Sequence, residues 1–484
     1  MCELDLPLKF AQKLYNEFAI RHPNAFYLRT RQRGMQNWDG KIHYITKTGQ
    51  FKIGLLPKVY DMCIEMGIKP KVVDMRQPLP KVSKVVTNIG KYKLRPEQEK
   101  AVKSVINNRV GDTPFHIGVL DYTVNAGKTL IMSSLYLSYK KQLKTLLITN
   151  DSDWLNQARE EFKQYLPGED ITFVQGKVLN WSNFTIGMVQ SISRNMRFYQ
   201  KELSQIDMVL IDEADQGGSK QYQNVITRLF NTRIRIGLSG TIYMSKLAKD
   251  RVKNMNLECF FGKVIAEFKL KDSIKKGYST KTVVKMVPGK PWYGNWESDC
   301  ISYKEIYDDS ITNCYTACLM AYNRLLWNLN QGRYPALVVC KHIAHCENLY
   351  KFFKKKLGDA YNIAYVHVNT PSKLRQQIMK DFREGKIDIL VSTTIIARGK
   401  NFPKLRYLLN AASMDSQEKS IQFLGRLVRT DKSKKKVYLD DLHYPGPYLD
   451  RHGKHRKQYY QRQELKVILL DKLWKKHPNR SEER

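Results

Sequence analysis

Short apolar runs alternate with helical stretches from about residue 90 to residue 445. Apolar runs of this length suit buried strands, and the stretches between them have room for helices. The runs are LLIT from 146, TIGMV from 185, MVLI from 208, IRIGL from 234, ALVVC from 336, DILVS from 388 and VYLDD from 437. The alternation predicts βαβ units with parallel sheets, and hence an α/β fold.

The runs fall into two sets, which a Lys-rich segment containing Gly277 and Gly289 separates at 268–290. A chain of 484 residues is too long for one ordinary domain. We therefore expect two α/β domains, at 89–270 and 271–447.

The two ends of the chain differ from this pattern. Residues 1–88 hold an amphipathic stretch (8–18), a basic turn (29–34) and the segment NWDGKI before a Pro- and Lys-containing linker. We expect a small α+β domain there. Residues 448–484 begin with RHGKHRK and continue with YYQRQELKVILLDKLWKK, which predicts a basic helical tail.

The chain is strongly basic, with 82 Lys and Arg against 46 Asp and Glu, a formal net charge of +36. Because the excess is spread along the whole length, a nucleic acid is the expected large partner. A membrane surface is not expected, since the longest apolar runs are only strand-sized. Glu3 and Asp5 stand where a secretory signal carries basic residues, so we expect a cytoplasmic protein.

Eight cysteines occur without a CxxC pair, and we expect them to be reduced. Cys340, His342, His345 and Cys346 lie close enough in sequence to suggest a metal site. They directly follow an apolar run and lack a second ligand pair at zinc-finger spacing, so packing is the preferred interpretation.

The segment TVNAGKTLI at 123–131 follows an apolar run and precedes a helical stretch. In that setting Gly127, Lys128 and Thr129 are expected to form a phosphate-binding loop, where backbone amides and a helix N-terminus hold the phosphates. Lys128 would reach the β- and γ-phosphates of ATP, and the Thr129 hydroxyl would hold Mg²⁺. Tyr122 stands where the full P-loop pattern has its first glycine, and a bare AGKT also occurs by chance.

The apolar run MVLI leads directly into Asp212, Glu213, Ala214 and Asp215. Carboxylates at the carboxyl end of a strand are placed to hold a metal and a catalytic base. Asp212 would hold Mg²⁺ through water, and Glu213 would orient and deprotonate the water that attacks the γ-phosphate. In isolation, four such residues would more often be a solvated acidic turn.

Near the end of the second set lies QFLGRLVR, at 422–429. Gln422, Arg426 and Arg429 are spaced by four and three residues, so on a helix they share one face. That face could place guanidinium groups on the γ-phosphate across an interdomain cleft. The alternative is a solvated basic helix.

With these three motifs in order, the chain resembles the superfamily 2 helicases over residues 90–445. The resemblance implies two tandem RecA-like domains that hydrolyse ATP with Mg²⁺. In YKLRPEQ, Gln98 matches the family's adenine-reading glutamine, and Arg95 resembles the residue that packs on the base. The implied nucleotide-binding residues are Arg95, Gln98, Ala126, Gly127, Lys128, Thr129 and Gly399.

The resemblance also implies residues that bind nucleic acid and couple it to hydrolysis. LLITNDSDWLNQ, MVQS and VSTTIIARGKNFP resemble the strand-binding motifs, although Asn150 replaces the usual proline and Asn401 the usual aspartate. The implied binding residues are Thr149, Asn150, Gln157, Gln190, Ser191, Thr393 and Thr394. Ser239, Gly240 and Thr241 match the motif that couples hydrolysis to strand movement.

WDGKI, at 38–42, resembles the N-terminal domain of the phage UvsW-type helicases, which remodel branched DNA. The resemblance implies DNA contacts by Trp38 and Lys41, 3′ to 5′ movement, and work on forks and junctions in phage recombination, repair or replication. The alternative is that Trp-Asp-Gly forms a hairpin turn that serves only the fold.

Other functions remain open at this point. An ATP-dependent RNA helicase shares the same motifs. A DNA-binding protein with a helicase fold and no turnover is a second alternative, and the motor half of a restriction or remodelling complex is a third. Tyr459 and Tyr460 either stack on splayed bases or pack the final helix.

Overall fold

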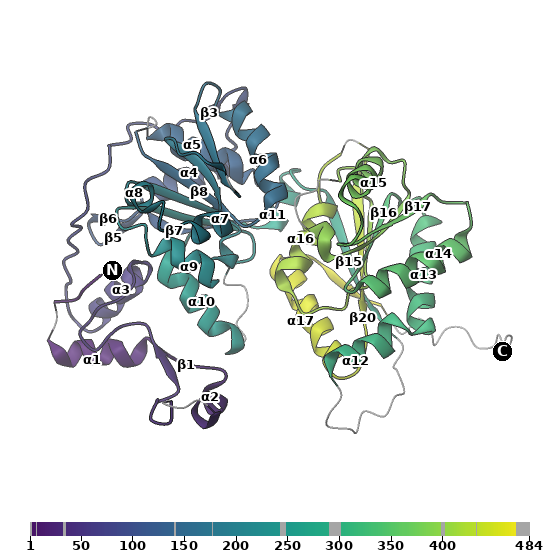
Figure 1. Ribbon diagram of the computed structural model, residues 1–484, viewed down its shortest axis with the longest axis horizontal. Helices are drawn as coiled ribbons and strands as arrows, with labels where there is room; N and C mark the ends of the chain where they lie inside the picture. Colours follow the sequence, from purple (N-terminus) through teal and green to yellow (C-terminus); the bar gives the residue numbers. More distant parts are fainter. Residues whose placement is uncertain are drawn as a thin grey trace. The chain divides into compact units, whose positions relative to one another are not determined.

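The computed structural model describes residues 2–5, 7–31, 35–139, 142–176, 178–242, 248–289, 302–397, 402–431 and 433–470. Two compact units make up the chain, Met1–Phe268 and Lys269–Arg484. Each contains a central parallel sheet with helices on its faces (Figure 1). The predicted α/β fold with two parallel-sheet domains is confirmed.

The first unit is built on a sheet of eight strands, of which only the edge strand β10 runs antiparallel. Its spatial order is β10 (Val178–Leu179), β9 (Ile171–Gln175), β11 (Phe184–Met188), β8 (Thr145–Thr149), β12 (Met208–Asp212), β13 (Ile234–Ser239), β7 (Ile117–Tyr122) and β14 (Val264–Phe268).

The second unit has a seven-stranded, fully parallel sheet. Its spatial order is β17 (Ile363–Val366), β18 (Ile389–Thr393), β16 (Ala336–Cys340), β19 (Tyr407–Asn410), β20 (Lys436–His443), β15 (Lys281–Pro288) and β21 (Val467–Leu469). If the seven parallel strands of each unit are ranked by sequence, both sheets have the spatial order 3-4-2-5-6-1-7. The two units therefore repeat one topology.

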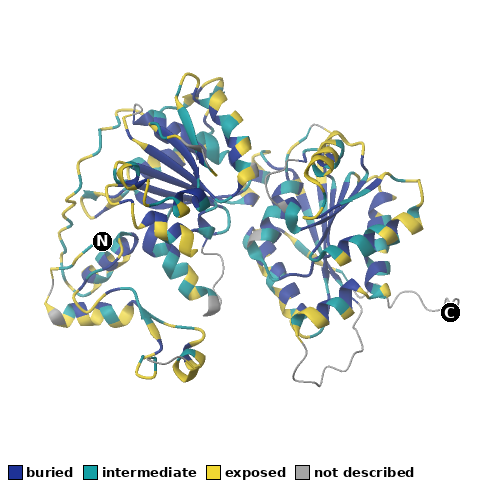
Figure 2. Cartoon of the chain, viewed as in Figure 1, coloured by how far each residue is buried: buried dark blue, intermediate teal, exposed yellow. Residues whose placement is uncertain are grey.

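Helices cover the sheets and leave the strands buried (Figure 2). Those of the first unit after the N-terminal segment are α4 (Pro96–Ile106), α5 (Lys128–Ser138), α6 (Ser152–Tyr165), α7 (Val189–Arg194), α8 (Gln200–Ser204), α9 (Lys220–Ile226) and α10 (Ala248–Phe261). Those of the second unit are α11 (Leu270–Lys275), α12 (Tyr303–Tyr307), α13 (Tyr315–Leu329), α14 (Ile343–Leu357), α15 (Ser372–Glu384), α16 (Gln417–Leu427) and α17 (Leu449–Arg462). Within the described ranges, every helix is too short or too polar to span a bilayer.

All seven apolar runs of the sequence lie in strands, namely β8, β11, β12, β13, β16, β18 and β20. Strands buried on both faces read as continuous apolar stretches, which is why the runs were visible. Every residue of β8, β12 and β16, for example, is buried.

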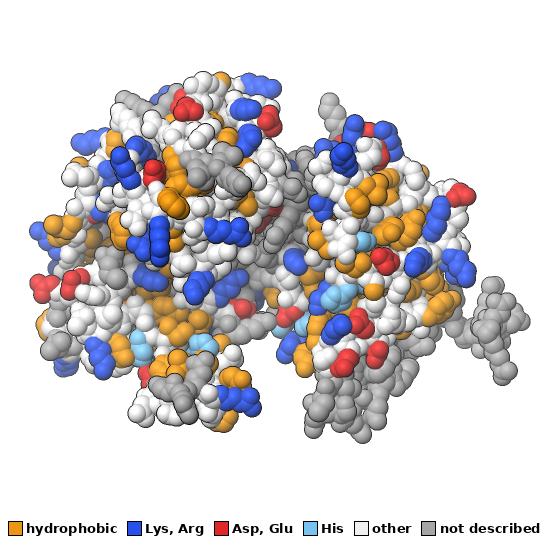
Figure 3. Space-filling view, viewed as in Figure 1, with side chains coloured by type: hydrophobic (Ala, Val, Ile, Leu, Met, Phe, Trp, Pro, Cys, Tyr) orange, Lys and Arg blue, Asp and Glu red, His pale blue; other side chains and the backbone are white. Residues whose placement is uncertain are grey.

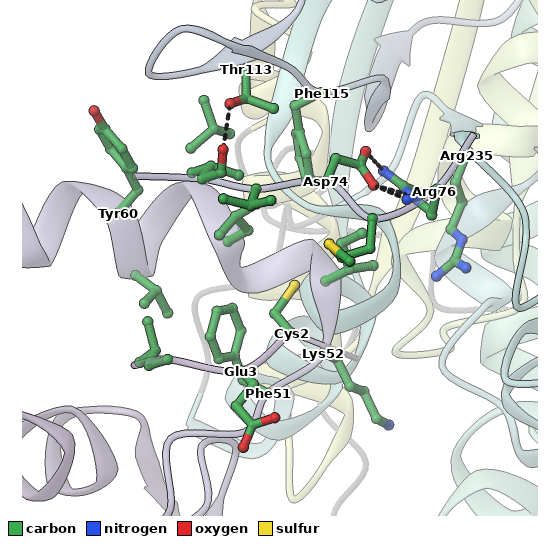
Figure 4. Close-up of a pocket in the computed structure, with 18 of the residues that line it drawn as sticks. Cys2, Glu3, Phe51, Lys52, Tyr60, Asp74, Arg76, Thr113, Phe115 and Arg235 are labelled. Atoms are coloured by element: carbon green, nitrogen blue, oxygen red, sulfur yellow. Dashed lines mark hydrogen bonds and ion pairs between the residues drawn. The ribbon is translucent and has the colours of Figure 1, made fainter. Parts of the chain in front are cut away.

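The N-terminal segment comprises α1 (Leu8–Glu17), β1 (Ala19–Arg21), α2 (Ala25–Arg31), β2 (Lys41–His43) and α3 (Leu56–Glu65). The chain that follows runs along the first unit. Thr113 Oγ1 donates to the Val72 carbonyl (3.0 Å), and Arg76, paired with Asp74, donates to the Thr232 carbonyl (2.8 Å) (Figure 4). These contacts explain why the segment and the first sheet form one compact unit.

A cavity of about 650 Å³ lies beneath this linker, between α3 and the first sheet (Figure 4). Its lining is mostly apolar, with Arg235 of β13 at one side. Burial lowers the pKa of Arg235 to about 10. The cavity contains none of the site residues predicted from the sequence.

The C-terminal segment is only partly the predicted helix. After α17 the chain forms β21, which pairs in parallel with β15 at the edge of the second sheet. The apolar residues Val467, Ile468 and Leu469 therefore complete a sheet and do not extend a helix. Tyr459 and Tyr460 are buried, so they pack α17, and the base-stacking alternative is wrong.

Candidate functional site

The loop between β7 and α5 has the backbone shape of a phosphate-binding loop. Asn125 and Gly127 both have positive φ (65° and 73°), and α5 begins at Lys128. A Cβ at position 127 would lie 2.3 Å from Nε2 of Gln98, so only glycine suits both the conformation and the space. The free amides of the first turn of α5 can hold an anion there.

Gln98 is almost fully buried and holds this loop in place. Its Oε1 accepts from the backbone N–H of Arg95, and its Nε2 donates to the carbonyl of Ala126, both at 2.8 Å. The Arg95 guanidinium donates to the Asn125 carbonyl at 3.5 Å. Gln98 thus links α4 to the loop, while adenine recognition by Gln98 and Arg95 remains a prediction.

Asp212 ends the buried strand β12, at the same edge of the sheet as the loop. Its Oδ1 is buried and accepts no hydrogen bond from the described residues. Burial raises the pKa of the Asp212 carboxyl, and the nearby Lys128 ammonium opposes this rise. A buried carboxylate oxygen with no protein partner suits an added cation.

The next strand brings a third loop to this edge. Ser239, the last residue of β13, donates to Asp215 (2.8 Å), and its Oγ accepts from the backbone of Thr241 (3.1 Å). A Cβ on Gly240 would lie 3.1 Å from Thr123 Cα, so this loop closely approaches the phosphate-binding loop. The structure therefore brings the AGKT, DEAD and SGT segments together.

The sequence motifs do not predict two further residues of this site. Thr123 Oγ1 and both side-chain amide atoms of Asn125 are buried with no hydrogen-bond partner among the described residues. Buried polar atoms are usually paired in the folded chain or by a ligand. Their position between β7 and Ala126 was the only available signal, because Thr and Asn are also common in ordinary loops.

Tyr222 of α9 is a further residue of this site that the sequence motifs do not predict. Its hydroxyl is buried without a partner among the described residues, and burial, followed by the charge of Glu213, raises its pKa well above the usual value. Tyr222 therefore lies close to the carboxylates that follow β12. Nothing in the sequence pattern distinguishes it from a core tyrosine.

The predicted strand-binding residues of the first unit follow β8 and β11, and several have protein partners. Thr149 Oγ1 accepts from the backbone of Asp151 (3.2 Å), and Ser191 Oγ accepts from that of Gly176 (2.9 Å). Gln190 donates to the Asn150 carbonyl at 3.3 Å. Gln157 donates to Glu161 on α6. Their contact with nucleic acid remains a prediction.

In the second unit, Thr393 ends the buried strand β18, and Thr394 begins the next turn. Lys419 of α16 donates to Thr394 Oγ1 at 3.2 Å, which ties this turn to the helix that carries the arginine motif. Gly399 and Asn401 lie outside the described residues.

Gln422 and Arg426 lie on α16, but the helix ends at Leu427, before Arg429. The backbone N–H of Thr280 donates to the Val428 carbonyl (2.8 Å), and its hydroxyl donates to the Arg429 carbonyl (3.1 Å). Thr280 thus provides hydrogen-bond donors for the two carbonyls that follow the end of α16. The shared helical face predicted for all three residues therefore holds only for Gln422 and Arg426.

The Cys and His residues at 340–346 pack in the second core. Cys340, His345 and Cys346 are buried, and the hydroxyl of Tyr307 lies 3.1 Å from Nδ1 of His345. Burial lowers the pKa of His345 to about 3. No group of three potential His, Cys, Asp or Glu metal ligands occurs in the part of the chain that the structure describes.

Two family models match the chain. The model for the type III restriction enzyme res subunit matches residues 91–244, and that for the helicase conserved C-terminal domain matches residues 319–431. The first match contains the AGKT, DEAD and SGT segments, and the second contains the Gln-Arg motif. The matches thus divide between the two units.

Whole-chain similarities are weaker but extend further. The chain is 22% identical to "Putative helicase 22" of Sulfolobus islandicus filamentous virus, over 73% of this chain and 64% of that protein. It is also 22% identical to "ATP-dependent DNA helicase uvsW" of Enterobacteria phage T4, over 84% and 82%. The match thus spans less than two thirds of the viral relative.

A solved structure supports the fold. The fragment of a putative HsdR subunit of a type I restriction enzyme from Vibrio vulnificus YJ016 is 15% identical and superposes with a TM-score of 0.57, over 78% of this chain and 69% of that one. With the repeated sheet topology and the order of the motifs, these matches show that the chain is a UvsW-like member of helicase superfamily 2, a family of ATP-hydrolysing enzymes.

Proposed function

We propose that the protein is an ATP-dependent DNA helicase or translocase that remodels forks, junctions and D-loops, moving 3′ to 5′, in phage recombination, repair or replication. The observation that carries the ATP-dependent part is the set of unpaired buried atoms at one sheet edge. Asp212 Oδ1, Thr123 Oγ1 and the Asn125 amide lie beside the start of α5 with no protein partner among the described residues.

The site suits a nucleotide triphosphate. The backbone amides at the start of α5 and the Lys128 ammonium would hold the phosphates, which are the anions such a loop binds. Gln98 keeps the loop in its left-handed conformation through the Ala126 carbonyl. The unpaired atoms of Thr123 and Asn125 would gain partners when the nucleotide binds.

Mg²⁺ would be held by Asp212 and the Thr129 hydroxyl. Magnesium uses one or two carboxylates together with substrate phosphates, so a single buried carboxylate is an adequate protein contribution. Bound there, the ion would neutralise charge on the β- and γ-phosphates. The unpaired Oδ1 of Asp212 is the oxygen that fits this role.

Glu213 would position the attacking water and take its proton. It follows Asp212 with a positive φ (51°), a conformation that turns the chain sharply at the strand end. Gln422, Arg426 and Arg429 of the second unit would stabilise the charge that develops on the γ-phosphate. Ser239, bonded to Asp215, would couple this step to strand movement.

The protein would bind DNA mainly through contacts with the phosphates. Lys and Arg side chains are spread over the visible face of both units (Figure 3), and the chain carries a net charge of +36. Such contacts do not read base sequence and weaken steeply with salt. Binding should therefore be largely independent of sequence.

The test is the ATPase rate with single-stranded DNA, a four-way junction, duplex DNA and single-stranded RNA. Lys128→Ala supplies the blank, and Lys103→Ala, an exposed lysine on α4, is the matched control. Stimulation greatest with junction or fork DNA would support the proposal. Stimulation by RNA alone would replace it with an RNA helicase, and no turnover with any of them would leave a DNA-binding protein.

A further inference from the structure

The WDGKI residues form a hydrogen-bonded turn that packs against α2 in the N-terminal segment. The Trp38 indole N–H donates to the Lys41 carbonyl (2.8 Å), and Asp39 accepts from the Lys41 backbone (2.9 Å) while contacting His43 (2.7 Å). Gly40 has a φ of +80°, and a Cβ there would lie 3.1 Å from Cβ of Ala25. The polar atoms of this turn are thus engaged in holding the fold.

This turn supports the short helix α2. Ala25 is buried against the turn, and the His22 backbone donates to the Gly40 carbonyl (2.8 Å). The following two residues project outward, since Phe26 is 81% exposed and Tyr27 is 54% exposed. Adjacent exposed apolar side chains mark interaction sites more often than scattered single ones do.

The sequence around the pair is basic, although Glu17 and Asp39 flank it and Asp39 lies in the turn that packs against α2. From residue 18 to residue 38 the sequence contains four arginines and no Asp or Glu. Arg29 and Arg31 lie in the last turn of α2, and the Arg31 guanidinium lies 5.0 Å from the centre of the Tyr27 ring. Figure 3 shows hydrophobic and basic side chains side by side at this end of the N-terminal segment.

We propose that α2 is a base-stacking element that binds unpaired nucleotides at a DNA branch point. Phe26 and Tyr27 stack on the exposed bases, and Arg29 and Arg31 contact the flanking phosphates. Aromatic rings bind bases of any sequence, and the guanidinium groups of Arg29 and Arg31 carry the charge opposite to that of the strand. Trp38 then acts as a support for α2 and not as a contact. This inference rests on the proposed function.

The test uses a synthetic fork whose branch-point nucleotide is unpaired 2-aminopurine, with linear duplex of the same length as a second substrate. For the full-length protein we expect stacking to quench the probe, and Phe26→Ala/Tyr27→Ala to remove the quenching. The affinity for the fork should fall by roughly 5- to 100-fold, since stacking contributes about that much per base. Duplex affinity and the melting temperature should stay unchanged, because both rings are exposed.

Matched variants distinguish base stacking from non-specific hydrophobic binding. Phe230→Ala removes another largely exposed ring of the same unit and should leave fork binding intact. Phe26→Trp/Tyr27→Trp should retain quenching, whereas Phe26→Leu/Tyr27→Leu should lose it. Full binding and quenching by the alanine or leucine double variant would overturn the inference.

The two proposals can fail separately. DNA stimulation of the wild-type ATPase tests the proposed function without reference to α2. If DNA stimulates the wild-type ATPase but Phe26→Ala/Tyr27→Ala binds forks normally, only the role of α2 is wrong. If no DNA stimulates the wild-type ATPase, the proposed function itself is wrong, and the inference is withdrawn with it.

Discussion

The two units share one strand order but differ in the polar residue that ends the fifth strand of each sheet. The fifth strand of the first sheet, β12, ends at Asp212, whose buried Oδ1 has no hydrogen-bond partner in the described parts of the chain. The fifth strand of the second sheet, β19, ends at Asn410. Its amide donates to Asp441 (2.8 Å) and accepts from the Ala412 backbone (3.3 Å). At the same position of the fold, the polar side chain is therefore available to a ligand in the first unit and is hydrogen-bonded within the protein in the second.

Two buried carboxylates of the second unit are likewise paired. Asp440 accepts from Arg324 (2.9 Å), and Asp441 accepts from Arg456 (2.9 Å) and Tyr460 (2.8 Å). Arg456 also donates to the carbonyls of Met414 (3.0 Å) and Leu442 (2.9 Å). These contacts fasten α17 to the loop that leads into α16.

The difference teaches that a repeated fold need not repeat its site. An unpaired buried polar atom costs free energy unless a ligand completes it, so the proposed nucleotide site would lower the stability of the first unit without ligand. In the second unit, the buried carboxylates Asp440 and Asp441 are paired with arginines. The Arg456 network fixes the loop before α16, the helix that carries the predicted catalytic residues Gln422 and Arg426.

The largest expected effect is the loss of that network. Arg456→Met should destabilise the second unit by about 3–5 kcal/mol, because a buried carboxylate loses its partner. Urea denaturation followed by circular dichroism measures the change. Lys454→Met removes an exposed cation from the same helix and should change stability little. Equal stability of the two variants would show that the Arg456 network is not the basis of the difference.

Lys128→Ala should have its effect on activity and not on folding. We expect the DNA-stimulated ATPase rate to fall by at least about 100-fold, since a charged donor to the phosphates is lost. The melting temperature without nucleotide should stay close to wild type. ATP with Mg²⁺ should stabilise the wild-type protein only. Normal turnover in this variant would place the ATP site elsewhere.

Asp212→Asn and Asp441→Asn form a matched pair with opposite expected signs. Burial raises the folded-state pKa of Asp212, so its contribution to stability is present at low pH and is lost as pH rises through that pKa. Without nucleotide, Asp212→Asn should therefore be more stable than wild type at pH 8, by about 1 kcal/mol. Asp441→Asn should be less stable, because Arg456 loses its counter-charge. Melting curves with the same sign for both variants would contradict the comparison.

The sequence predicted strands and motifs far better than it predicted partners. Apolar runs such as LLIT and MVLI reveal fully buried strands, and AGKT and DEAD follow strands in an order that few folds share. The spacing rule for a helix could not show that α16 stops before Arg429, because the end depends on Thr280, about 150 residues away. Contacts between distant residues decide such ends.

The same limit applies to other parts of the site and to the C-terminal segment. Gln98 holds Ala126 through a contact that no spacing rule predicts, and the unpaired atoms of Thr123 and Asn125 are visible only in three dimensions. Val467–Leu469 is apolar enough for a helix or a strand. The free edge of β15 decides between them.

The smallest expected effect concerns Lys434, a buried cation of the second unit that donates to two backbone carbonyls. Its Nζ donates to Leu405 (3.0 Å) and to Leu427 at the end of α16 (3.1 Å). Burial lowers its pKa from 10.5 to about 8, and Asp431 opposes this fall.

Because the folded-state pKa lies below the unfolded value, the folded protein binds fewer protons, and stability should rise as pH increases from about 8 to 10.5. Lys434→Met should show a flatter pH dependence of the urea midpoint in that window, while the exposed Lys435→Met should follow the wild type. Measuring the difference between variants cancels the titration of tyrosines and cysteines, which all three proteins share. Parallel pH profiles would mean that Lys434 reaches solvent when it is charged, so that its burial does not lower the stability of the second unit.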